Sequence, residues 1–75
     1  MAIYRLLQNS AFEPDDVDRM VAAYESALRH LRLAASSESI INELVAKAVI
    51  SVAQTGVRDP ERISALAIEQ LRSGR

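Results

Sequence analysis

The sequence predicts an all-helical fold, a bundle of three helices with a short helix or arm at its N-terminus. Apolar residues recur every three or four positions in three separate segments, as they do on the buried face of a helix. Proline and acidic residues stand at the start of two of these segments, where they favour helix initiation. Of all residues, 49% are hydrophobic but only 4% are aromatic, so the core must be aliphatic. A chain of 75 residues is expected to form a single domain, residues 1–75.

The first helix is predicted over residues 14–33. Pro14 is tolerated in a first helical turn, and Asp15 and Asp16 place negative charge at its positive end. Basic residues in the last turns suit the carbonyl end. Ser26 falls on the side opposite the apolar stripe, so we expect it to be solvated. The stripe consists of Val17, Met20, Val21, Tyr24, Ala27, Leu28 and Leu31.

The second helix is predicted over residues 37–55. Ser36 or Ser37 serves as its N-terminal cap, and Gly56 is the expected left-handed residue after its end. Its apolar positions are Ile40, Ile41, Leu44, Val45, Ala48, Val49, Val52 and Ala53, and Asn42 is the only polar interruption among them. A narrow polar arc is formed by Glu43, Lys47, Ser51 and Gln54. This helix is therefore expected to be central.

The third helix is predicted over residues 60–73. Asp59 is a favourable cap, and Pro60 suits the first helical position. Gly74 is expected to stop the helix. Its inner stripe consists of Ile63, Leu66, Ala67 and Leu71.

Residues 1–12 are expected to form a short helix or arm packed on the bundle. Ile3, Leu6, Leu7 and Phe12 make this segment too apolar for a disordered tail.

The second helix carries more apolar surface than an isolated three-helix bundle needs. Each helix in such a bundle buries an arc of a little over about 100°. We therefore expect a partner to cover the surplus, and a second copy of the chain is the first candidate, because two-fold dimers are the commonest closed assembly. The expected contact residues are Ile40, Leu44, Val45, Val49, Ile50 and Val52. The alternatives are a different protein, or the N-terminal arm folding over this helix within one chain.

The residue types present do not compose a recognisable catalytic or metal site. The chain has one histidine, His30, and no cysteine, so neither a multi-histidine nor a thiolate metal site can form within it. Its two glycines cannot build a phosphate-binding loop. No serine stands beside a recognisable base and oxyanion hole. We expect no enzymatic activity, no cofactor and no small-molecule ligand.

DNA binding is the alternative function. The second and third helices with the turn between them resemble a helix-turn-helix unit in outline. Arg58, Arg62, Arg72 and Arg75 supply positive charge, but Asp59, Glu61 and Glu69 occupy the same segment. Neutralising DNA phosphates normally requires a larger positive surplus. Nucleic acid is therefore ranked behind a protein partner.

A cytoplasmic location is expected. No apolar run approaches the roughly 20 residues of a membrane span, and the first residues lack the basic region and cleavage site of a signal peptide. The net charge of −1 gives no long-range field to attract a charged partner. The leading functional hypothesis is a small homo-oligomeric interaction or regulatory module.

Three stretches resemble a family of small uncharacterised helical proteins of alphaproteobacteria. They are residues 12–20, beginning Phe12-Glu13-Pro14, residues 43–47, and residues 54–62, which include Gly56-Val57-Arg58-Asp59-Pro60. The resemblance spans most of the chain. It implies a free-standing small helical protein and assigns no functional residues.

Overall fold

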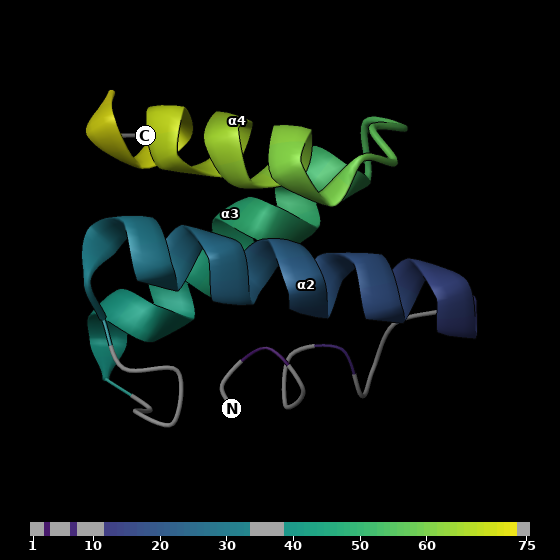
Figure 1. Cartoon of the computed structure of the whole chain (residues 1–75), viewed down its shortest axis with the longest axis horizontal. Coiled ribbons are helices and arrows are strands. Elements are labelled where there is room, and N and C mark those ends of the chain that lie inside the picture. The colour runs from purple at the N-terminus through teal and green to yellow at the C-terminus, as the bar shows by residue number, and fades with distance from the viewer. Residues whose placement is uncertain (1–2, 4–6, 8–11, 34–38, 74–75) are drawn as a thin grey trace.

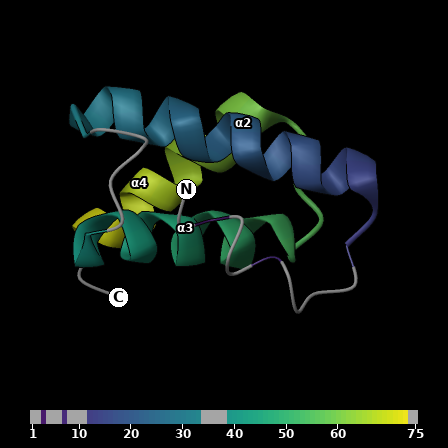
Figure 2. The ribbon, with the colours of Figure 1, turned by 90° about the horizontal axis from the view of Figure 1, so that it is seen from below.

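Three helices follow one another in the computed structural model: α2 (Pro14–Leu31), α3 (Ile40–Ala53) and α4 (Pro60–Arg72). The structure describes residues 3, 7, 12–33 and 39–73. α2 and α4 run in the same general direction, and α3 runs in the opposite one (Figures 1 and 2). Each helix packs against both others. The predicted all-helical, three-helix architecture is therefore confirmed for this part of the chain.

α2 begins at Pro14 as predicted but ends at Leu31, two residues before the predicted end. Arg32 turns the chain out of the helix, because its backbone is left-handed with φ 59° and ψ 40°. The N–H of Leu33 then donates to the carbonyl of Leu28 at 2.9 Å. This bond satisfies one of the carbonyl groups that a helix leaves unpaired at its end.

α3 begins at Ile40, later than predicted, because Ser39 is its cap. The Ser39 hydroxyl accepts a hydrogen bond from the backbone N–H of Asn42 at 3.3 Å and donates one to the Asn42 side-chain oxygen at 3.1 Å. Asn42 is buried, and its side-chain oxygen is satisfied by the hydroxyl of the capping residue. The predicted start at residue 37 is wrong, since residue 39 is not helical, and Ser36 and Ser37 lie outside the described residues.

α3 ends at Ala53, two residues before the predicted end at residue 55, but the left-handed residue after it is Gly56 as predicted. Gly56 has a positive φ of 99°. The Asp59 carboxylate caps α4 by accepting a hydrogen bond from the N–H of Glu61 at 3.3 Å. α4 ends at Arg72, and the predicted stop at Gly74 lies outside the described part of the chain.

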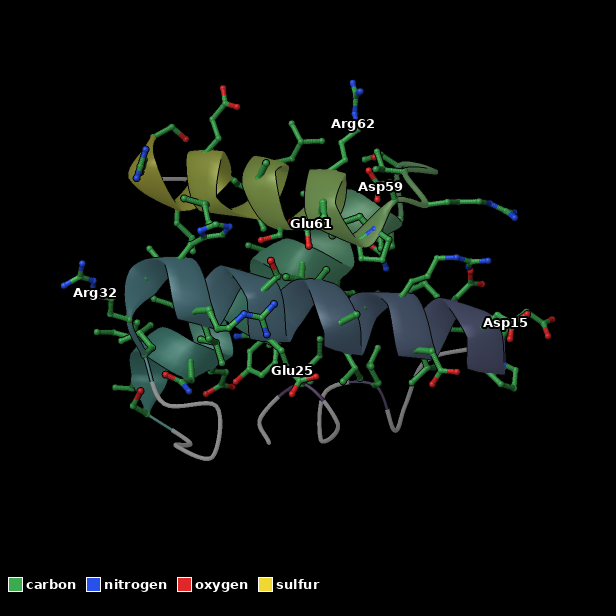
Figure 3. All side chains as sticks on the ribbon, in the orientation of Figure 1. Asp15, Glu25, Arg32, Asp59, Glu61 and Arg62 are labelled. Atoms are coloured by element: carbon green, nitrogen blue, oxygen red, sulfur yellow. The ribbon has the colours of Figure 1, made fainter. Side chains whose placement is uncertain are left out.

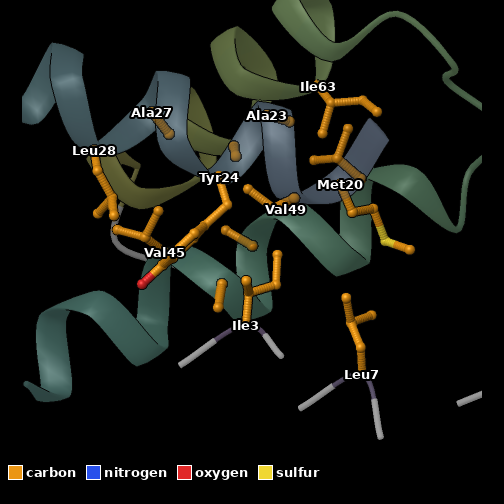
Figure 4. Packing of buried hydrophobic residues seen from close by; sticks show 14 residues of the cluster. Ile3, Leu7, Met20, Ala23, Tyr24, Ala27, Leu28, Val45, Val49 and Ile63 are labelled. Carbon is orange, nitrogen blue, oxygen red and sulfur yellow. The ribbon is translucent and has the colours of Figure 1, made fainter. Parts of the chain in front are cut away.

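The core is built from all three helices and from two residues near the N-terminus. Ile3 and Leu7 are helical in backbone and buried, with 0% and 8% of their surface exposed. Both direct their side chains into the hydrophobic cluster (Figure 4). Packing of the N-terminal segment on its own bundle is thus confirmed at these two positions. Leu6 lies outside the described residues, and Phe12 is partly buried.

One face of α2 is packed where the sequence analysis expected solvent. Ser26 is only 3% exposed, so its predicted solvation is wrong. Ser26 shares a helical face with Arg19, Ala23 and His30, and both Arg19 and His30 line pockets together with residues of α4. α2 therefore buries a second side against α4, and its buried arc is wider than the apolar stripe alone.

Candidate interaction surface

The chain itself buries half of the predicted contact residues. Val45, Val49 and Val52 have only 0%, 0% and 7% of their surface exposed and belong to the core of a single chain. They cannot form a contact surface in this fold, so the sequence prediction is corrected at these three positions. Ile3 lies beside α3 in the same cluster (Figure 4) and supplies cover that three helices alone lack.

In the part of the chain that the structure describes, the large apolar side chains that stay exposed lie on the first turns of α3. Ile40 is 77% exposed, Ile41 56% and Leu44 49%, and we call these three residues the α3 patch. Ile40 and Leu44 were among the predicted contact residues, whereas Ile41 was not. Ile50, which was also predicted, is partly buried against the core.

Helical geometry explains the exposure of Ile40 and Leu44, although not that of Ile41. With about 100° between successive residues, Ile40 projects between Lys47 and Ser51, and Leu44 projects beside Ser51. Ile40 and Leu44 thus belong to the polar arc of the helix, although they are apolar. The sequence carried this signal, because the angular position of each residue follows from its number alone.

Charges of both signs border the α3 patch. The Lys47 ammonium lies 4.0 Å from a carboxylate oxygen of Glu43, and the two side chains are 61% and 34% exposed. Ser51 and Gln54 continue the exposed face toward the end of α3. The surface is therefore a small apolar area with a polar rim, which is the usual anatomy of a protein–protein contact.

The exposed charges of the α3–turn–α4 unit are of both signs. Its exposed, described basic residues are Lys47, Arg58, Arg62 and Arg72, and its exposed acidic residues are Asp59, Glu61 and Glu69. Figure 3 shows Asp59, Glu61 and Arg62 together on the first turn of α4. Arg75 lies outside the described residues. This mixture does not provide the positive surface that DNA phosphates require.

Within residues 3, 7, 12–33 and 39–73, no group of three histidine, cysteine, aspartate or glutamate side chains is placed to hold a metal ion. His30 is exposed in the last turn of α2.

None of the three helices is both long enough and apolar enough to cross a membrane.

Comparisons with protein-family models, with curated proteins and with solved structures found no match to this chain.

Proposed function

We propose that this chain is a protein–protein interaction module that associates with a second copy of itself through the α3 patch. One observation carries the proposal. The large apolar side chains exposed on the described part of the chain are Ile40, Ile41 and Leu44, and all three lie on one helix end. Scattered exposed apolar residues are normal, but a contiguous group with a polar rim marks a contact site.

The area of the α3 patch sets the strength of the proposed association. Burying one Ile or Leu side chain fully contributes roughly 1.5–3 kcal/mol, and the patch exposes the equivalent of about two such side chains. A two-fold contact uses the patch twice, so the gross gain is roughly 6–12 kcal/mol. Association costs an estimated 4–15 kcal/mol in lost freedom. The most favourable balance of these ranges, about 12 against 4 kcal/mol, corresponds to a dissociation constant near 1 µM. The expected dimer is therefore weak, with a dissociation constant in the micromolar range or above.

The charged rim favours a second copy over an unrelated protein. In an antiparallel pair of α3 helices, positions 43 and 47 are equally far from a two-fold axis at the level of residue 45. Such a pair sets Glu43 of each copy beside Lys47 of the other and brings the two Leu44 residues together near the axis. Opposite charges placed in this way fix the register of a contact more than they add affinity.

Sedimentation velocity between about 10 µM and 1 mM tests the proposal over the affinity range derived above. We expect the mean mass of the wild-type chain to rise from 8.3 kDa toward twice that value with concentration. In Leu44→Glu, two like charges meet near the axis, so this variant should stay near 8.3 kDa throughout. Ala22→Glu is the matched control, because Ala22 is exposed and belongs to a different helix, α2; it should associate like the wild type.

Circular dichroism of each variant confirms that the fold is retained. A wild-type mass that does not change with concentration would contradict the proposal and leave the α3 patch to a different protein. A Leu44→Glu variant that associates as strongly as the wild type would also contradict it.

A further inference from the structure

A pocket of about 130 Å³ lies where the first turns of α2 meet the turn between α3 and α4. It stands at the end of α3, whereas the α3 patch stands at the beginning of that helix. The residues around it range from Phe12 to Ile63 in the sequence, so no local motif announces it. An inference drawn from this pocket is independent of the proposed self-association.

The floor of the pocket is apolar. Met20 and Ile63 each have only 1% of their surface exposed, and both line the pocket. Phe12, Val57 and Ala53 complete the apolar lining and are partly buried. An engineered apolar cavity of about 150 Å³ holds one benzene molecule. The pocket as a whole is thus close in volume to a cavity that holds a single six-membered ring.

The rim of the pocket is cationic. The Asp16 carboxylate lies 2.5 Å from a guanidinium nitrogen of Arg19, so these two charges balance each other. Arg58 also lines the pocket and is exposed. Among the described residues, its guanidinium has neither a hydrogen-bond nor an ion-pair partner. The rim therefore carries one uncompensated positive charge beside an apolar floor.

We propose that this pocket binds a small aromatic carboxylate, with the ring on the apolar floor and the carboxylate on Arg58. The thioether of Met20 favours contact with an aromatic ring. Guanidinium groups form their strongest hydrogen bonds with carboxylates, often through two parallel N–H donors. The pocket volume limits the ligand to one ring with short substituents.

The test is a titration of the full ¹⁵N-labelled chain with benzoate, followed by two-dimensional NMR. A ligand of this size should bind with a dissociation constant of roughly 1 mM. Saturable shifts should be confined to the pocket. Benzamide, which has the same shape without the charge, should bind roughly 3- to 10-fold more weakly, as expected when a solvent-exposed ion pair with its hydrogen bond is lost.

Two variants and one control assign the binding to the pocket. Arg58→Gln should weaken benzoate binding by roughly the same 3- to 10-fold, whereas Arg62→Gln, which removes an exposed charge outside the pocket, should leave it unchanged. Ala53→Leu should abolish binding, because the larger side chain fills the space above the floor.

Three results would overturn the proposal. They are shifts that do not saturate, equal affinities for benzoate and benzamide, and unchanged benzoate binding in Ala53→Leu or Arg58→Gln. The unliganded spectrum of each variant shows whether its fold is intact.

Discussion

Arg32 adopts a backbone conformation that glycine usually occupies at the end of a helix. Its φ of 59° and ψ of 40° lie in the left-handed region, and its N–H bonds to the carbonyl of Arg29 at 3.2 Å. A side chain in this region costs roughly 1–2 kcal/mol per residue, because Cβ crowds the following carbonyl. The Arg32 side chain extends away from the bundle into solvent (Figure 3), so no packing offsets this cost.

Replacing Arg32 with glycine is expected to stabilise the protein. Relief of the left-handed strain exceeds the extra freedom that glycine gives the unfolded chain, and the net gain should be roughly 0.5–1 kcal/mol. Arg29→Gly removes the same charge from an exposed helical position and should instead cost about 1 kcal/mol. Urea unfolding of both variants measures the two effects. The account of Arg32 is wrong if both substitutions lower the free energy of unfolding by similar amounts.

Single residues also show where prediction from the sequence reached its limit. Ile40 is exposed because its angular position lies on the polar side of the helix. The sequence analysis grouped it with the apolar arc because the residue itself is apolar. The burial of Asn42 followed from its place in the apolar arc, but its bond to Ser39, which satisfies the buried side chain, did not follow from any pattern. Ser26 was misplaced because α4 packs against a second side of α2. Local periodicity contains no information on how many neighbours a helix will have.

At the scale of the elements, the start of a helix was predicted correctly where the sequence offered a single candidate for the N-terminal cap. Asp59 stands directly before Pro60, so only one start of α4 was plausible, and the structure confirms it. Several serines precede α3, and the one chosen, Ser39, is the one with Asn42 three positions later. The ends were less predictable, because a left-handed residue such as Arg32 is not marked by its residue type.

The cap of α4 yields a prediction about helix stability. Asp59→Ala removes the acceptor for the N–H of Glu61, and loss of such a cap typically costs about 1 kcal/mol. Asp59→Asn keeps an oxygen acceptor at the same position and should stay within a few tenths of a kcal/mol of the wild type. Chemical denaturation followed by circular dichroism compares the two. Equal stabilities of Asp59→Ala and Asp59→Asn would show that the bond contributes nothing.

For the whole molecule, burial of Ile3 and Leu7 in the core accompanies burial of most of the apolar surface of α3. The surplus on the second helix was expected to include Val45 and Val49, but both are buried in a core that also contains Ile3 and Leu7. The sequence analysis had left this arrangement open as the alternative to a partner. Only the tertiary structure distinguishes cover by the chain's own N-terminal residues from cover by a partner, because both would bury the same residues of the second helix. Within the described residues, the smaller α3 patch is what remains for a partner.

The most direct test of the central claim, that the α3 patch is the surface through which two copies associate, is a dilution series followed by residue-resolved NMR. Spectra of the ¹⁵N-labelled wild-type chain between about 1 mM and 10 µM cover the expected range of the dissociation constant. We predict that the amide signals of Ile40, Ile41, Leu44 and Lys47 shift with concentration while those of α4 and of the first turns of α2 stay fixed. Signals that do not change on dilution, or changes centred on another helix, would contradict the claim.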